Sequence, residues 1–200
     1  MLGAEQLAAL VLFCFVTSVT PGPNNMMLLA SGVNFGFART IPHMLGIAIG
    51  FTAMIVLVGL GIGELFAVFP WLHGAMKIAG LVYMLWLAWK IANAGGPGEA
   101  REGARPMTFV QAAAFQWVNP KAWAMALSAI AAYTIAESHL ASLAVVAATF
   151  GLVNLPTIAL WAMFGVWLRR SLSDPRNVRR FNWTMAALLV ASLVPVLFEG

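Results

Sequence analysis

Six long apolar runs follow one another along the chain and leave few residues between them. They cover residues 7–33, 41–63, 69–92, 107–133, 140–168 and 181–198. A helix that crosses the hydrocarbon core of a bilayer needs about 20 such residues. None of the runs alternates between apolar and polar residues as a barrel strand does, so we expect each to be helical. The sequence therefore predicts an all-α integral membrane protein with six transmembrane helices.

The composition excludes an ordinary soluble domain. Of the 200 residues, 62% are hydrophobic and only 9% are charged, and the mean hydropathy is +0.87. Soluble domains are about 45–50% apolar and about 25% charged, and a fold of this size cannot bury so much apolar surface. The single cysteine, Cys14, excludes an internal disulfide and a cysteine-based metal cluster.

The basic residues gather in alternate loops. Of the 11 Lys and Arg residues, nine follow the first, third and fifth runs, Lys77 lies on the other side, and Lys121 lies within the fourth run. Cytoplasmic loops carry an excess of Lys and Arg. We therefore expect Arg-rich loops in the cytoplasm and both termini outside, and the same bias argues against an outer membrane. The net charge of +4 then reflects topology in the lipid bilayer, and we expect no nucleic-acid partner.

A linker rich in Gly, Pro and charge, residues 94–106, divides the chain into two halves of similar length. We expect one membrane domain built from two three-helix repeats, 1–93 and 107–200. Because each half has an odd number of spans, the repeats would be inverted. The first helix of each half is interrupted near its middle. Such paired Pro and Gly interruptions point to a transporter binding site at the repeat interface.

The first interruption reads Thr-Pro-Gly-Pro-Asn-Asn at residues 20–25. Pro21 and Pro23 remove two backbone donors, and Gly22 permits conformations closed to other residues. Asn24 and Asn25 add amide donors and acceptors, and a helix resuming after Pro23 would direct its positive end at the break. We expect these five residues to bind a ligand, such as a carboxylate. The alternative is a proline kink whose asparagines only satisfy backbone groups.

The second interruption is Asn119, Pro120 and Lys121. A lysine in the middle of a span costs about 2.5–3.5 kcal/mol on insertion scales, so it should face a polar interior. No Asp or Glu lies at a comparable depth in the sequence. We expect Lys121 to meet a bound anion or to lose its proton. The alternatives are that it extends to the interface or is satisfied by carbonyl groups freed at Pro120.

Asn154 and Pro156 in the fifth run indicate either a third break facing the same cavity or a simple kink. Both are included in the expected site. Trp117 and Trp123 flank the second interruption and could line a cavity. In the second run, Gly46 and Gly50 form a pair of small residues four apart, which favours close helix packing.

Motifs for catalysis and for metal binding are missing from the sequence. It contains no P-loop, no paired deep carboxylates, no G-x-S-x-G and no H-E-x-x-H. His43, His73 and His139 lie near the ends of runs and lack metal-ligand spacing. We therefore expect neither an enzyme nor a bound metal or cofactor, and transport would draw on an ion gradient.

Four stretches carry a family resemblance: residues 20–25, the glycine-rich second run, residues 83–90 (Tyr-Met-Leu-Trp-Leu-Ala-Trp-Lys) and residues 119–122 (Asn-Pro-Lys-Ala). In this order they resemble the LysE/RhtB family of bacterial amino-acid exporters, and the resemblance covers essentially the whole chain. It implies a six-helix inner-membrane exporter of amino acids or close derivatives, driven by proton antiport. The chain looks nearer to the homoserine/threonine and cysteine/O-acetylserine branches than to the lysine branch. Residues 20–25 and 87–92 suggest the cysteine/O-acetylserine exporters.

The resemblance assigns Lys121 to the substrate carboxylate, and Asn24, Asn25 and Asn119 to its other polar atoms. A deep cation without a deep carboxylate also favours neutral amino acids over lysine. No buried acid is available to carry a proton, so Lys121 is the candidate, because burial favours the neutral form of a lysine. The alternative function is a passive channel or facilitator for small zwitterions or anions. The sequence leaves the amino acid open and allows a homodimer.

Overall fold

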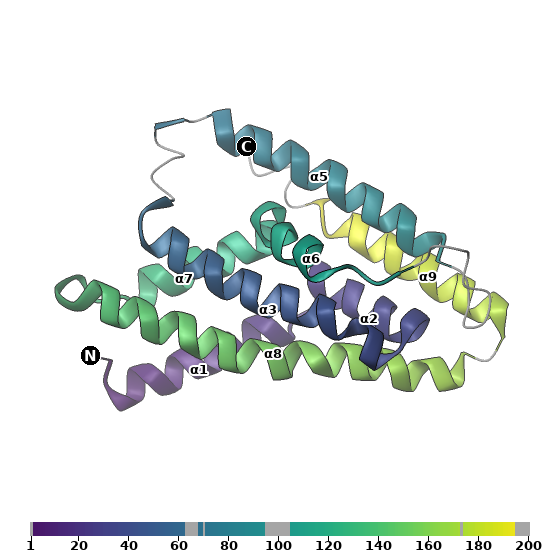
Figure 1. Ribbon diagram of the computed structural model, residues 1–200, viewed down its shortest axis with the longest axis horizontal. Helices are drawn as coiled ribbons and strands as arrows, with labels where there is room; N and C mark the ends of the chain where they lie inside the picture. Colours follow the sequence, from purple (N-terminus) through teal and green to yellow (C-terminus); the bar gives the residue numbers. More distant parts are fainter. Residues whose placement is uncertain (1, 63–67, 70, 95–104, 173, 195–200) are drawn as a thin grey trace.

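The computed structural model describes residues 2–62, 68–69, 71–94, 105–172 and 174–194, and every regular element within these ranges is helical (Figure 1). The first half contains α1 (Ala4–Val19), α2 (Pro23–Phe35), α3 (Phe37–Gly59) and α5 (Trp71–Ala92). The second half contains α6 (Phe109–Phe115), the 3-10 turn η2 (Gln116–Val118), α7 (Pro120–Tyr133), the 3-10 turn η3 (Ala136–Ser138), α8 (His139–Ser171) and α9 (Pro175–Ala191). Most of the predicted linker 94–106 lies outside the described residues.

Large apolar side chains point outward from the bundle. Leu12, Val110 and Leu152 are 62%, 71% and 77% exposed. A soluble monomer rarely leaves so extensive an apolar surface in water, and a hydrocarbon environment removes that cost. The predicted all-α membrane class is confirmed.

Helix length and composition give three candidate membrane spans, and a fourth if the bent pair α1 and α2 is one broken span. The three are Phe37–Gly59, Gly74–Ala92 and Ala136–Arg170. The other two predicted spans fall on α6, η2 and α7, which are interrupted, and on α9, whose described helix has 17 residues. The six-span inverted arrangement therefore stays a prediction.

Both predicted interruptions are real ends of helices. The chain bends by 57° between α1 and α2, and α2 begins with Pro23 in its first turn. In the second half, α7 begins at Pro120 after an extended Asn119. Proline suits the first position of a helix because the N–H that it lacks has no intrahelical partner there.

For the fifth apolar run, the sequence left two possibilities, a helix break or a simple kink. The predicted break at Asn154 and Pro156 is wrong, because α8 continues through both residues. Pro156 blocks one backbone hydrogen bond, and the neighbouring Thr157 hydroxyl donates to the carbonyl of Val153 at 2.7 Å. At about 1.5 Å per residue, the 33 residues of α8 extend about 50 Å.

Glycines bring pairs of helices into backbone contact. A Cβ added at Gly32 of α2 would meet the backbone of Ala162 in α8, and one at Gly165 would meet the backbone of Leu29. Gly46 and Gly50 of α3 face α6 in the same way, so their predicted role in close packing is confirmed. Substitution at any of these glycines would separate the helices.

The connections between helices gather at two ends of the molecule (Figure 1). The turn between α2 and α3, the end of α5 and the C-terminal end of α8 lie at one end, on the right in Figure 1. The start of α1, the end of α3 and the α7–α8 connection lie at the other. The break between α1 and α2 falls near the middle of residues 4–35, so it lies between the two ends.

Candidate functional site

The break after α1 frees backbone carbonyl groups that side chains then satisfy. The amide of Asn25 donates to the carbonyl oxygens of Ser18 and Thr20, both at 2.8 Å. The indole N–H of Trp161 in α8 donates to the carbonyl of Val19 at 3.3 Å. Orphan carbonyls at a helix end need such partners away from water. Asn25 is buried, and its side chain satisfies backbone groups, as the alternative prediction of a proline kink had it.

Lys121 of α7 crosses to the same helix end. Its Nζ donates to the carbonyl oxygen of Thr20 at 2.7 Å, to the hydroxyl of Thr20 at 2.9 Å and to the carbonyl of Pro21 at 3.4 Å. These partners are neutral oxygen atoms, and the negative end of the α1 dipole adds to their attraction. The carbonyl groups that bind Lys121 belong to the first interruption. The alternative prediction, that they would be carbonyl groups freed at Pro120, is wrong.

Gly22 makes room for this lysine. A Cβ at Gly22 would lie 2.7 Å from Cδ and 3.1 Å from Nζ of Lys121. The extended backbone of Gly22 is open to any residue, with φ −177°. The absence of a side chain, rather than special backbone freedom, is what the position requires.

An amide pair joins the two breaks. Asn24 Nδ2 donates to Gln116 Oε1 at 2.8 Å, and Gln116 Nε2 donates to Asn24 Oδ1 at 3.3 Å. Gln116 is fully buried, and it also donates to the carbonyl of Ala112 at 2.8 Å. Asn119 caps α7 by accepting from the backbone N–H of Lys121 at 3.1 Å. Sequence reasoning missed Gln116, because a single amide within an apolar run carries no local pattern of its own.

Asn154 joins the site, whereas Pro156 does not. The amide of Asn154 donates to the hydroxyl of Ser18 at 3.2 Å, and its Oδ1 has no hydrogen-bond partner among the described residues. Pro156 is exposed on α8. Trp117 and Trp123 pack edge to face with ring centroids 6.0 Å apart.

A small cavity lies among these side chains, with a volume of about 30 Å³. That is room for about two water molecules. Six of the predicted site residues are in its lining: Gly22, Asn24, Asn25, Asn119, Lys121 and Asn154. The four predicted prolines, Pro21, Pro23, Pro120 and Pro156, are not in its lining. We call this space the break cavity.

The break cavity suits a small anionic group. Among its described lining residues, Lys121 is the one ionisable side chain. The first residues of α2 and of α7 also border it, so the positive ends of two helix dipoles lie beside it. A carboxylate placed here would meet an ammonium, amide groups and two positive helix ends.

A second cavity lies nearer the end of the molecule that carries the α2–α3 turn. Its volume is about 220 Å³, and it is lined by α2, α3, α5 and residues 105–107. His43 of α3, expected near a span end, is 1% exposed in its lining. Neither ring nitrogen has a hydrogen-bond partner among the described residues, at a cost of about 1–3 kcal/mol for each buried group. Sequence reasoning missed this cavity.

Comparison with known proteins decides the family. The family described as LysE type translocator matches residues 15–197, nearly the whole chain. The chain belongs to this family. The resemblance drawn from four stretches of the sequence is thereby confirmed, and family membership indicates an amino-acid efflux transporter rather than an enzyme. Transporter membership and apolar helices together indicate a multi-pass protein of a bacterial inner membrane.

Curated relatives of this LysE translocator share its length. The chain is 28% identical over 194 residues to the cysteine/O-acetylserine efflux protein of Escherichia coli (strain K12), covering 96% of this chain and 97% of the relative. The same values hold for the protein of that name from Shigella sonnei (strain Ss046). No solved structure matches the chain.

Proposed function

We propose that this LysE translocator exports small neutral amino acids, such as cysteine, O-acetylserine, homoserine or threonine, from the cytoplasm in exchange for protons. The break cavity would be its central substrate site. The observation that carries the proposal is the ammonium of Lys121, held between the two breaks by carbonyl and hydroxyl oxygens alone. The names of the relatives support cysteine and O-acetylserine as the first substrates to test.

In this mechanism, the substrate carboxylate competes with α1 for Lys121. The break cavity is too small for an amino acid, so binding requires the lysine to move from the carbonyls of Thr20 and Pro21. The carboxylate would then accept from Lys121 and the α2 N-terminus, while Asn24 and Asn119 contact its other polar atoms. A second cation in the substrate would be repelled, which disfavours lysine.

Proton exchange in this proposal also runs through Lys121, since the described lining of the break cavity holds no other titratable group. For net exchange, Lys121 would take up its proton from the outer side after the substrate leaves and give it up to the cytoplasm. Lys121→Arg tests this step, because arginine does not deprotonate usefully. Full pH-driven export by that variant would exclude Lys121 as the proton carrier.

The arrangement of helices supports two inverted repeats and the expected orientation. Equivalent helices of the two halves pack together, α3 with α8 and α5 with α9, and each pair runs in opposite directions (Figure 1). The end of the molecule with the turn at Gly36, the end of α5 and the α8–α9 connection carries the basic loops. We place this end in the cytoplasm.

Uptake of labelled amino acids into inside-out membrane vesicles tests the function. We expect O-acetylserine and cysteine to accumulate when the vesicle interior is acidic, and lysine to be excluded. Lys121→Ala should abolish accumulation. Equilibration without gradient-driven accumulation would instead support a passive facilitator, and uptake of lysine would overturn the electrostatic argument for a neutral substrate.

A further inference from the structure

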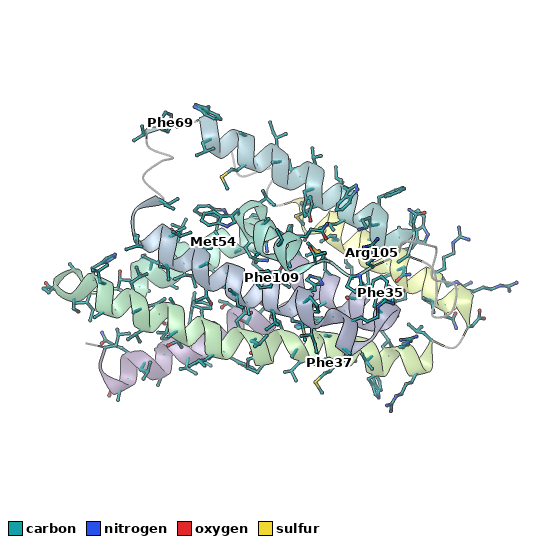
Figure 2. All side chains as sticks on the ribbon, viewed as in Figure 1. Phe35, Phe37, Met54, Phe69, Arg105 and Phe109 are labelled. Atoms are coloured by element: carbon teal, nitrogen blue, oxygen red, sulfur yellow. The ribbon has the colours of Figure 1, made fainter. Side chains whose placement is uncertain are left out.

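The second cavity is large enough for a ligand, whereas the break cavity is not. A cavity of about 150 Å³ holds a benzene molecule, and this one has about 220 Å³. We call it the α2–α5 cavity after the helices that bound it. It lies beside the α2–α3 turn, where Figure 2 labels Arg105 next to Phe35, and both residues line it.

The charged side chains among the described lining residues of the α2–α5 cavity have one sign. Lys90 of α5 and Arg105, which precedes α6, are exposed residues in its lining, and no described lining residue is acidic. The ammonium of Lys90 lies 4.7 Å from the ring centre of Trp86, so it is held near the end of α5. A carboxylate entering the cavity would meet two cations with no competing anion among the lining residues.

Two polar side chains of the cavity lining already have hydrogen-bond partners outside it. Ser31 and Thr40 share a hydroxyl hydrogen bond of 2.8 Å, and Asn34 donates to Asn182 at 2.9 Å. His43 is the exception, since both ring nitrogens lack a partner among the described residues. A neutral imidazole offers one donor and one acceptor, so the buried ring can accept from an amino group or donate to an oxygen of a ligand.

One face of α2 connects the two cavities. Asn24 lines the break cavity, while Met27, Ser31 and Asn34 line the α2–α5 cavity. Their spacing of three, four and three residues places them in one row along the helix. Ten residues of helix rise about 15 Å. The two cavities therefore lie along the same face of α2.

We propose that the α2–α5 cavity is a second binding site for a small zwitterionic amino acid, on the cytoplasmic side. The amino acid binds here before the break cavity opens. Arg105 and Lys90 bind the carboxylate, and His43 binds the polar groups at the other end of the ligand. The proposal rests on the proposed export function, whose substrates it takes as ligands.

Cysteine labelling tests occupancy without requiring transport. The chain has one cysteine, the buried Cys14, so Cys14→Ser removes the background. Ser31→Cys and, as a second reporter, Asn93→Cys then place a thiol in the α2–α5 cavity. The probe is a membrane-impermeant thiosulfonate, and Thr17→Cys in the smaller break cavity is the matched control.

We expect both reporters to be labelled in inside-out vesicles, not in right-side-out vesicles, and faster than Thr17→Cys. O-acetylserine and other zwitterions such as homoserine should slow the labelling, whereas acetate should not. Arg105→Gln and His43→Leu should each raise the half-protecting concentration about tenfold, the effect of losing one hydrogen bond to a charged group. His43→Gln, which keeps a donor and an acceptor, should restore protection.

Two results overturn this inference. One is labelling that no amino acid slows, and the other is equal protection by acetate. Uptake measured in the same vesicles separates the two proposals. Uptake without protection refutes the cytoplasmic site and leaves the export function standing. Protection without uptake refutes the export function and leaves a zwitterion site at the α2–α5 cavity.

Discussion

Replacing Lys121 by methionine should abolish transport while leaving the stability of the fold almost unchanged. The variant loses two short hydrogen bonds from Nζ, at 2.7 and 2.9 Å, and a longer one at 3.4 Å. Hydrogen bonds to a charged group contribute about 1.5–3 kcal/mol each. The carbonyl of Thr20 keeps its hydrogen bond from Asn25 at 2.8 Å and is not left unpaired. The two short bonds therefore contribute near the lower end of that range, and their loss costs about 3 kcal/mol of stability.

The removal of a charge from the membrane offsets that loss. A lysine at this depth costs about 2.5–3.5 kcal/mol on insertion scales, and replacing a buried charge by an apolar side chain is often neutral. We therefore expect the free energy of unfolding to change by less than about 2 kcal/mol. Denaturant unfolding in mixed micelles measures it, and O-acetylserine uptake into inside-out vesicles measures function.

Lys77→Met is the matched control, because Lys77 lies on α5 and does not line the break cavity. It should retain transport. A Lys121→Met protein that unfolds more than about 3 kcal/mol more easily would show that the lysine is mainly a structural tie between α7 and α1. A stable variant with normal uptake would refute its contact with substrate.

Two further perturbations act on the same site. Gly22→Ala places a Cβ against Lys121 and should displace its ammonium, lowering uptake and costing about 1–3 kcal/mol of stability. Gly74→Ala, with nothing within 4 Å of the added Cβ, should leave uptake unchanged and raise stability by up to about 1 kcal/mol, because alanine favours the helix. Asn24→Leu and Gln116→Leu each leave one amide of the bridge unpaired, at about 1–3 kcal/mol. The double variant should be less destabilised than the sum of the two, by about 0.5–3 kcal/mol in unfolding measurements, and simple additivity would contradict the bridge.

Backbone chemistry made the helix breaks predictable from sequence. Pro23 and Pro120 stand where α2 and α7 begin, because proline is compatible with a first turn and not with a helix interior. Pro156 shows the limit of that rule. A longer helix packed along α2 and α3 continues through it, and the sequence alone does not contain that tertiary support.

Partners across the bundle were not predictable. The depth of Lys121 followed from its place within an apolar run, but its bonds to Thr20 and Pro21 join residues 100 or more apart in sequence. Gln116 and His43 are single polar residues in apolar surroundings, and no local pattern separates them from interfacial side chains. Their burial is set by the packing of α3 and α6 through glycine contacts.

The bonds that hold Lys121 to α1 also set a concentration threshold. A substrate that uses this ammonium must first displace it from three oxygen atoms, and every 1.4 kcal/mol of that displacement weakens apparent affinity about tenfold. We expect a weak apparent affinity that follows from the resting contacts of the empty protein. An exporter of this kind drains an amino acid only when it accumulates, and leaves the ordinary metabolic pool in the cell.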